Sequence, residues 1–209
     1  MAARPIASRL VRLCLRPDGT LPRTPLLGSA VRGALLADLA LSGALTSTPD
    51  GLEVDTTPTG FEPADRLLHA VLRHPDRTTE WWLRRGPNGV EDVAADLVRR
   101  GVWSRRHGGL GTRYLEHDAR ELRADAERVR AATSGEPDSA STAALAAIVQ
   151  VTGADGSGAD QRPDAALLLA CAPAGWLMDD LVDYLITRRS LLAAAAADAR
   201  IALMANFIQ

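Results

Sequence analysis

Turn signals built from proline, aspartate and glycine divide this 209-residue chain into short segments, and most of the segments between them carry apolar residues at helical spacing. Proline presets one dihedral angle of a tight turn, and glycine accepts the positive φ that such turns often need. The pattern predicts a mainly α fold, a single compact helical domain that carries two or three small β-hairpins. The strongest turn signals are Pro17-Asp18-Gly19, Pro49-Asp50-Gly51 and Gly108-Gly109-Leu110-Gly111.

Three stretches around these turns predict the β-structure. Apolar and polar residues alternate over residues 9–16, which is typical of a strand. Residues 45–55 and 102–115 each contain two short extended runs on either side of a turn, which is typical of a hairpin. Residues 1–8 show no periodicity, so we expect a flexible N-terminus followed by one domain over residues 9–209.

Apolar residues three and four positions apart predict the helices. The first covers residues 24–41, and Gly43 follows it as a residue that can end a helix in the left-handed conformation. Asn88 and Asp118 are each followed three residues later by a glutamate, which is the capping-box spacing and predicts that helices begin there. Further helices are expected in the Ala- and Leu-rich C-terminal third and over residues 63–73 and 79–85.

Composition and charge exclude several classes of protein. With 46% apolar residues the chain can bury one sizeable core, and a net charge of −2 argues against a surface that coats nucleic acid. No uncharged stretch reaches the roughly 18 to 20 residues that a membrane-spanning helix needs. Both cysteines, Cys14 and Cys171, lie in apolar runs without metal-ligand spacing, so we expect buried thiols in a reducing compartment. These features predict a soluble cytoplasmic protein, and nothing indicates a cofactor.

No group of residues indicates catalysis. The four histidines lack the spacing of metal ligands, and the glycine motifs that bind nucleotide phosphates do not occur. Asp179, Asp180 and Asp183 could bind a cation or act as a carboxylate pair, but a solvated helix face explains them better. We therefore expect a protein that is not an enzyme and that holds no metal.

Three further motifs occur in a fixed order. An apolar helix over residues 29–41 contains the pair Arg32-Gly33, a Pro58-Thr59-Gly60 turn follows the first hairpin, and Leu97-Val98-Arg99-Arg100-Gly101-Val102 leads into the second. Their order and spacing resemble the Golgi phosphoprotein 3 family from about residue 10 to about residue 130. The resemblance implies the compact helical fold of that family.

The resemblance also implies a peripheral membrane protein that binds the phosphorylated inositol headgroup of phosphatidylinositol 4-phosphate in a basic pocket. Arginine suits such a headgroup because its planar guanidinium group pairs two phosphate oxygens at once. Arg32 falls on the pocket arginine of the family's first helix, and Arg23 falls on the pocket aromatic. The two other pocket arginines fall on Pro87 and Val90. With two nearby arginines that could replace this charge, the candidate headgroup-binding residues are Arg32, Arg23, Arg84 and Arg85.

The hairpin over residues 102–115 corresponds to the element with which the family enters the bilayer. Leu110 lies at its expected tip, and Arg105, Arg106 and Arg113 surround it. Burying a leucine side chain contributes roughly 1.5 to 3 kcal/mol, and each arginine beside an anionic membrane contributes roughly 1 kcal/mol. These residues predict reversible, salt-sensitive attachment to an anionic phospholipid surface, which for a cytoplasmic protein is the inner face of the plasma membrane. The same domain could serve as an adaptor for a protein partner.

Two other functions remain open. The first is a winged-helix DNA-binding regulator, because helices over residues 35–44 and 93–101 each precede a hairpin, and arginines of the second hairpin could contact phosphates. A recognition helix should display several basic or amide side chains, and the first of these helices displays none, so we expect no nucleic acid partner. The second is a helical protein-interaction module that binds no lipid. The sequence does not indicate an oligomeric state.

Overall fold

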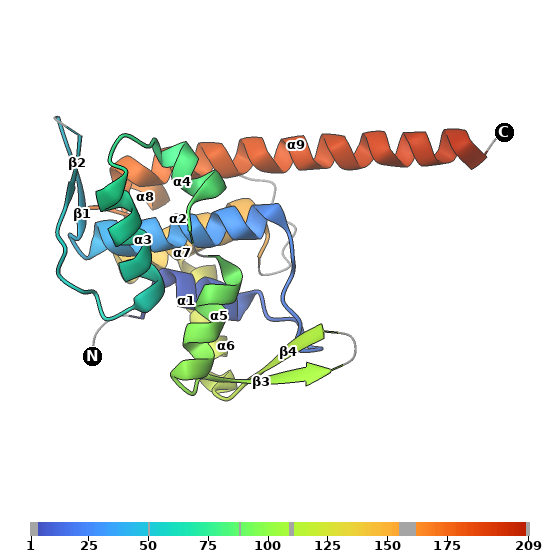
Figure 1. The fold of residues 1–209 in the computed structure, drawn as a ribbon, viewed down its shortest axis with the longest axis horizontal. Helices are drawn as coiled ribbons and strands as arrows, with labels where there is room; N and C mark the ends of the chain where they lie inside the picture. Colours follow the sequence, from blue (N-terminus) through green and yellow to red (C-terminus); the bar gives the residue numbers. More distant parts are fainter. Residues whose placement is uncertain (1–3, 50, 88, 109–110, 155–161, 208–209) are drawn as a thin grey trace.

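The computed structural model describes residues 4–49, 51–87, 89–108, 111–154 and 162–207. Within these residues the chain is mainly α, with nine helices and two antiparallel hairpins (Figure 1). The expected fold class is therefore confirmed. In chain order the elements are α1 (Ile6–Leu13), α2 (Pro25–Leu41), β1 (Leu45–Thr48), β2 (Gly51–Val54), α3 (Glu62–Arg73), α4 (Thr79–Arg85), α5 (Val90–Arg99), β3 (Trp103–Gly108), β4 (Gly111–Glu116), α6 (Ala119–Thr133), α7 (Ala140–Thr152), α8 (Ala165–Leu169) and α9 (Gly175–Phe207).

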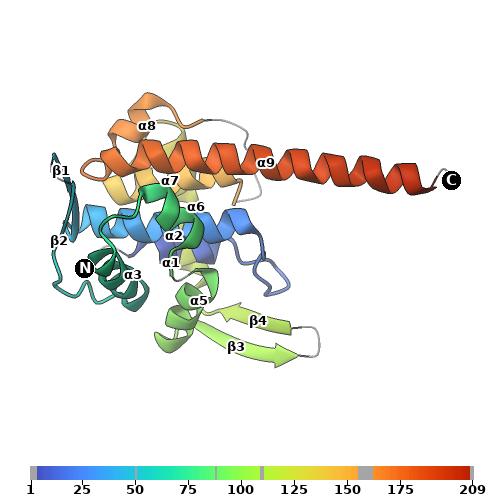
Figure 2. The same ribbon diagram turned by 45° about the horizontal axis from the view of Figure 1, so that its top comes forward.

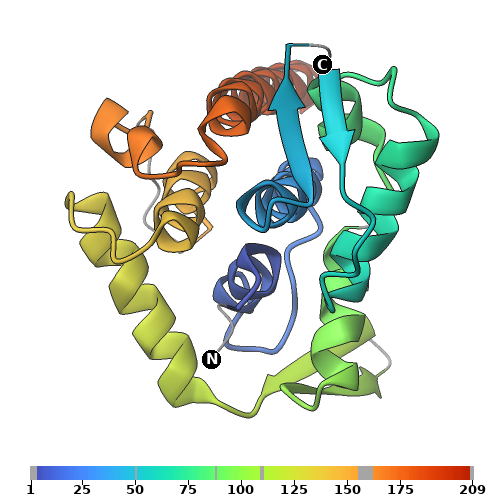
Figure 3. The ribbon, with the colours of Figure 1, turned by 90° about the vertical axis from the view of Figure 1, so that its left-hand side faces the viewer.

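The helices α1 and α2 lie at the centre of the molecule, and the other elements surround them (Figure 3). α2 buries 11 of its 17 residues because it is apolar on most of its surface. The glycine of the Arg32-Gly33 pair has a packing role, because a Cβ atom at Gly33 would collide with the side chain of Leu181 on α9. The C-terminal half of α9 extends away from the other elements (Figures 1 and 2).

The structure contradicts the strand predicted over residues 9–16, because most of this segment belongs to α1. Ile6, Ala7, Leu10 and Val11 are all fully buried, and their i, i+1, i+4, i+5 spacing is helical. The alternating pattern over residues 9–16 resembles a strand only when the buried Ile6 and Ala7, which precede it, are not considered. α1 begins inside the segment that we expected to be a flexible N-terminus, so the end of that segment is helical and buried.

The two other β-predictions are confirmed. Leu45 pairs with Val54 in the β1–β2 hairpin, and Trp103 pairs with Glu116 in the β3–β4 hairpin. Gly43 has a φ of 76° and follows the end of α2 as predicted. The helices expected over residues 24–41, 63–73 and 79–85 correspond to α2, α3 and α4.

Of the two predicted helix caps, the one at α6 is confirmed and the one at α5 differs. At α6 the Asp118 side chain accepts a hydrogen bond at 3.0 Å from the backbone N–H group three residues later, as expected. At α5 the cap residue is Gly89, whose N–H group donates to Asp92 Oδ2 at 2.9 Å. Asn88, the cap that the sequence predicts, lies outside the described residues. The carboxylate that reaches back at α5 therefore belongs to Asp92 and not to Glu91.

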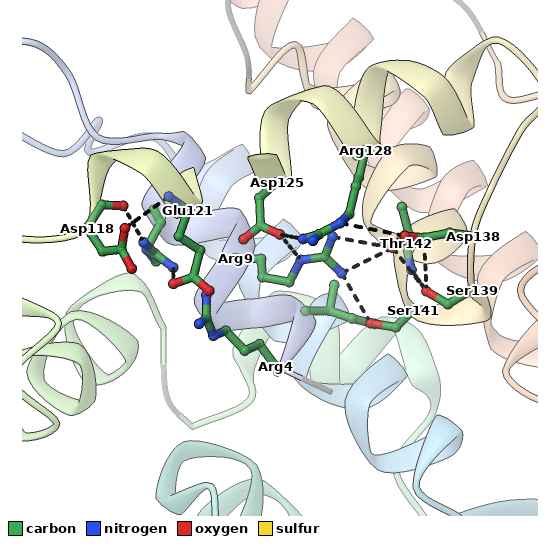
Figure 4. Close-up of polar contacts among 12 residues, drawn as sticks. Arg4, Arg9, Asp118, Glu121, Asp125, Arg128, Asp138, Ser139, Ser141 and Thr142 are labelled. Carbon is green, nitrogen blue, oxygen red and sulfur yellow. Dashed lines mark hydrogen bonds and ion pairs between the residues drawn. The ribbon is translucent and has the colours of Figure 1, made fainter. Parts of the chain in front are cut away.

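Arg9 of α1 is almost completely buried and binds both α6 and α7 (Figure 4). Its Nε atom donates to Asp125 Oδ1 at 3.1 Å, and its two Nη atoms lie 3.4 and 3.3 Å from Thr142 Oγ1. Arg128 donates to the same aspartate oxygen at 3.1 Å. A guanidinium group leaves water at a high cost in free energy unless such partners replace the water. The partners on α6 and α7 therefore allow α1 to occupy the core.

Arg12, nearly one turn further along α1, is only 2% exposed and binds both β4 and α6. Its Nε atom donates to Glu116 Oε2 at 2.9 Å, and its Nη1 atom donates to Glu121 Oε2 at 3.1 Å. Glu116 also accepts a hydrogen bond from Trp103 Nε1 at 2.8 Å. Burial by itself would raise the pKa of Glu116, but the hydrogen bonds from Arg12, from the Asp118 N–H group and from Trp103 outweigh it and lower the pKa. The carboxylate is therefore held in its charged form beside Arg12.

We predict that Arg12→Ala lowers the free energy of unfolding by roughly 3 to 5 kcal/mol, because it leaves the largely buried carboxylate of Glu116 without its cation. Chemical denaturation of the wild type and the variant measures this difference. Arg16→Ala, which removes an exposed arginine from the segment after α1, is the matched control and should change the stability by less than about 0.5 kcal/mol. Equal effects of the two substitutions would contradict the role assigned to Arg12.

Asp38 of α2 caps the N-terminus of α1. Its Oδ1 atom accepts a hydrogen bond from the N–H group of Ile6 at 2.7 Å, and Oδ2 accepts one from Ala7 at 3.1 Å. α1 has no side-chain cap of its own, so a neighbouring helix satisfies its first free N–H groups. Burial nevertheless raises the pKa of Asp38 to about 7, against the effect of these hydrogen bonds and of the Arg9 charge.

This pKa predicts a pH-dependent contribution of Asp38 to stability. The pKa is about 7 in the folded protein and 3.8 ordinarily, so the protonated carboxyl group stabilises the fold at low pH, and this contribution is lost as the pH rises to about 7. Asp38→Asn has no proton to lose. The free energy of unfolding of the wild type minus that of Asp38→Asn should therefore fall by a few kcal/mol between about pH 4 and about pH 7. Denaturation at a series of pH values measures this difference, and a constant difference would contradict the raised pKa.

Candidate functional site

Arg32 is half-buried on α2 and joins this helix to α4. Its Nε atom donates to the carbonyl oxygen of Leu83 at 2.7 Å, and its Nη2 atom donates to that of Arg84 at 3.4 Å. The last carbonyl groups of a helix lack helical partners, and the negative end of the helix dipole attracts a cation. Arg32 thus caps the C-terminus of α4.

Three glycines lie close to the Arg32 side chain, and two of them approach Nη1, which this cap does not use. A Cβ atom at Gly28 would lie 3.7 Å from Nη1 and 3.8 Å from Nη2, and one at Gly89 would lie 3.9 Å from Nη1. A Cβ atom at Gly86 would lie 3.3 Å from Arg32 Cδ. None of these positions carries a side chain, and Nη1 forms no hydrogen bond with the residues that the structure describes. We call Arg32 and these three glycines the glycine cradle.

The glycine cradle also lies at the start of α5. This helix begins at Val90, directly after Gly89. Asp92 accepts a hydrogen bond from the N–H group of Gly89, whereas the N–H groups of the first helical turn have no partner within the helix and suit an anion. The positive end of α5 therefore lies beside the guanidinium group of Arg32, an arrangement that suits a phosphate group. Burial lowers the pKa of Arg32, but an arginine keeps its charge at neutral pH. Pro87 and Val90, on which two family arginines fall, flank Gly89 and carry no charge.

The three other predicted headgroup residues lie at the ends of α4 and α5. Arg23 is exposed, and its Nη2 atom lies 3.7 Å from Glu91 Oε1 in the first turn of α5. Arg84 donates no side-chain group to the cradle, because only its backbone carbonyl meets Arg32 and its exposed side chain lines a neighbouring groove. Arg85 is exposed and forms no hydrogen bond with Arg32. Arg32 and Arg23 thus each approach a residue at the start of α5, whereas Arg84 lines the groove.

The β3–β4 hairpin presents a basic face. Arg106 and Arg113 lie directly opposite each other in the antiparallel ladder, and Leu115, which is 51% exposed, follows on the same face of β4. The opposite face carries Tyr114, whose ring centroid lies 5.0 Å from that of the buried Trp103. Like charges that face each other across two strands destabilise a hairpin. An external anion would relieve this repulsion.

All three arginines predicted for membrane contact, Arg105, Arg106 and Arg113, are exposed. None of them forms an ion pair with another residue in the described part of the chain. Leu110, the predicted tip residue, lies outside the described residues. The positive charge of the hairpin is therefore available to an external partner.

The glycine cradle and the contact between Glu91 and Tyr114 were not predicted from the sequence. Gly28 carried a usable signal, because an isolated glycine in a helical pattern costs about 1 kcal/mol relative to alanine and often has a packing or functional reason. Gly86 and Gly89 read as ordinary residues of a connection, so only their approach to Arg32 distinguishes them. Tyr114 donates its hydroxyl hydrogen to Glu91 Oε2 at 3.2 Å, and no local pattern indicates that contact.

A groove of about 950 Å³ lies between α4, α9 and the β1–β2 hairpin. Trp176 and Tyr184 of α9 contribute aromatic surface to it. Asp183, one of the three aspartates noted in the sequence, forms an ion pair with Arg162. Because its walls carry charges of both signs, the groove suits a polypeptide better than a phosphate group alone. The charged residues that line it are Arg77, Glu80, Arg84, Asp180, Asp183 and Arg188.

Several alternatives lose support in the structure. Among the described residues, no group of three or more His, Cys, Asp and Glu side chains is placed to hold a metal ion. In that same part of the chain, no helix is long and apolar enough to cross a membrane. α2 is enclosed by other elements, so it cannot enter a DNA groove as a recognition helix. At the end of α5, which is the second candidate recognition helix, Arg99 and Arg100 pair with the buried Asp96. Neither arginine is therefore free to contact DNA.

Comparison with known proteins identifies a family. A sequence model described as Golgi phosphoprotein 3 matches residues 6–168, which is more than half of the chain and runs from α1 into α8. The matched region contains the glycine cradle and the β3–β4 hairpin, whereas α9 lies beyond it. No curated protein matches the chain.

Proposed function

This chain belongs to the Golgi phosphoprotein 3 family, and on that premise we propose that it is a non-enzymatic protein that attaches peripherally to anionic phospholipid membranes. The observation that carries the proposal is the exposed hairpin face on which Arg106 opposes Arg113 beside Leu115. The family is not known as a family of enzymes. The proposal includes a cytoplasmic location, with attachment to the inner face of the plasma membrane.

An anionic surface compensates the charge of the hairpin. Each arginine near such a surface contributes roughly 1 kcal/mol, and the exposed Leu115 adds apolar area that can enter the interface. The two arginines and one leucine of this face support reversible binding, since stable anchoring takes two strong signals such as two lipid chains. Salt screens charges beyond roughly 10 Å at 0.1 M ionic strength, so binding should weaken as the salt concentration rises.

The glycine cradle supports a phosphate-bearing headgroup as the specific ligand. Arg32 Nη1 would donate to a phosphate oxygen, and the first N–H groups of α5 would stabilise the phosphate charge. Arg23, which lies at the same helix end, adds a second positive charge. A phosphoinositide-like headgroup fits this arrangement because it carries a phosphomonoester group in addition to the phosphodiester that links it to glycerol.

We predict that Arg106→Gln/Arg113→Gln reduces the partitioning of the protein onto phosphatidylglycerol vesicles about ten- to thirtyfold at low salt, because two contributions of roughly 1 kcal/mol are lost. Liposome co-sedimentation at low and physiological salt measures the partition coefficient. Arg120→Gln/Arg130→Gln, two exposed arginines of α6, is the control that removes the same charge elsewhere. Equal losses for the two double variants would show that total charge governs binding. Absence of wild-type binding at low salt would refute the membrane proposal.

We predict that Gly28→Ala separates the binding role of Arg32 from its structural role. The added methyl group would lie in ordinary contact with the guanidinium group and would fill the cradle, while alanine favours the helix by roughly 0.5 to 1 kcal/mol. The variant should therefore be at least as stable as the wild type, yet bind phosphatidylinositol 4-phosphate vesicles about tenfold more weakly, as for one lost charged hydrogen bond. Binding to phosphatidylglycerol through the hairpin should not change. Unchanged binding to both lipids would show that the cradle holds no headgroup.

A second candidate function is docking of another protein, and the groove between α4 and α9 favours it. The groove shares α4 with the glycine cradle, because Leu83 and Arg84 line the groove and also bind Arg32 through their carbonyl groups. An adaptor could thus hold a polypeptide and a lipid at the same time. Failure of the wild type to bind any anionic vesicle would favour this function without lipid binding.

A further inference from the structure

Glu91 places a negative charge at the site proposed for the headgroup. It is the second residue of α5 and follows closely after Gly89 of the cradle. Its Oε1 atom lies 3.7 Å from Arg23 Nη2, and its Oε2 atom accepts a hydrogen bond from the Tyr114 hydroxyl group at 3.2 Å. The start of α5 therefore holds an acidic side chain between the hairpin and Arg23.

The neighbouring carboxylate has a different role. Asp92 Oδ2 accepts the hydrogen bond that caps α5, and its Oδ1 atom lies 3.4 Å from Arg66 Nη1. Glu91 takes no part in the cap, and its side chain is 66% exposed, so it can move without unfolding the helix. Of these two acids, Glu91 is the one that a ligand can displace.

We propose that Glu91 is a selectivity residue that acts as an internal counter-anion for Arg23, so that the site disfavours headgroups with a single negative charge relative to those that carry an additional phosphate. This inference rests on the proposed headgroup site. A phosphodiester with one charge gains little from Arg23, because Glu91 already neutralises this arginine and repels the ligand. A phosphomonoester carries a charge of about −1.5 to −2 at pH 7, so its attraction to Arg23 and Arg32 exceeds the repulsion from Glu91.

The size of the effect follows from the exposure of the pair. Exposed ion pairs contribute up to about 1 kcal/mol, so Glu91 lowers the affinity for a singly charged lipid by roughly two- to fivefold and does not block the site completely. Tyr114 keeps the carboxylate near Arg23 in the absence of lipid. Selectivity arises because the repulsion from the Glu91 carboxylate is large relative to the attraction of a singly charged headgroup and small relative to that of a phosphomonoester.

Glu91→Gln tests this inference, because glutamine keeps an acceptor for Tyr114 and removes the charge. The probes are phosphatidylcholine vesicles that contain either phosphatidylglycerol or phosphatidylinositol 4-phosphate at matched total negative charge. Glu91→Gln should bind the phosphatidylglycerol vesicles roughly two- to fivefold more tightly than the wild type, with a smaller change for the phosphatidylinositol 4-phosphate vesicles. The preference for the doubly charged headgroup should therefore fall.

Two further variants separate this role from a general change of charge or of stability. Glu53→Gln removes the same charge from an exposed position on β2, which lies on the opposite side of the molecule from the β3–β4 hairpin (Figure 3), and should leave the preference unchanged. In an Arg23→Gln background, Glu91→Gln should no longer change the preference, because the charge that Glu91 neutralises is gone. A loss of the favourable interaction between Glu91 and the α5 dipole would lower the unfolding midpoint but would not alter the ratio of the two lipid affinities.

The outcomes distinguish the inference from the function on which it rests. If the wild type binds anionic vesicles and Glu91→Gln has the same lipid preference as Glu53→Gln, the role of Glu91 is refuted and the membrane function stands. If neither the wild type nor Glu91→Gln binds either vesicle, both are refuted. A preference that falls in Glu91→Gln alone, and only when Arg23 is present, supports the inference.

Discussion

The buried guanidinium groups of α1 are the constraint on which the rest of the fold depends. Arg9 and Arg12 lie on a helix at the centre of the molecule, so each needs polar or anionic partners within hydrogen-bond reach. These partners come from β4, α6 and α7, between 104 and 133 residues away in the sequence. The network thereby connects the first helix of the chain to its middle and fixes β4, α6 and α7 against it.

In the candidate site, too, an arginine that is partly removed from water has acceptors within hydrogen-bond reach, here at the end of a helix. Arg32 gives two donors to the carbonyl groups of α4, so the fold positions its side chain before any ligand arrives. An arginine that is already ordered loses less conformational entropy on binding, which favours recognition of a phosphate group. One side chain therefore has both a structural and a proposed binding role. Gly28, where a Cβ atom would make only ordinary contacts with the guanidinium group, 3.7 Å from the Nη1 atom that the α4 cap does not use, allows the two roles to be tested separately.

Most of the elements were predictable because their signals are local. The spacing of apolar residues indicated α2, α3 and α4, and the turns at 49–51 and 108–111 indicated both hairpins. α1 was mistaken for a strand because its arginines look like the polar positions of an alternating pattern, and their buried partners lie far away in the sequence. At the start of α5, Glu91 and Asp92 are both placed in the first turn, and the sequence does not reveal which carboxylate accepts the hydrogen bond from the N–H group of the cap residue.

By itself, the sequence determined the family, the mainly α character of the chain and the presence of an arginine-rich second hairpin, because periodicity, turn chemistry and motif order depend on residues that are near one another in the chain. Only the tertiary structure decided that Arg12 is buried, that three glycines lie close to Arg32, and that Glu91 faces Arg23. These features depend on which distant segments meet. The type of a residue states what kind of partner it needs, and only the packing of the helices determines which partner it finds.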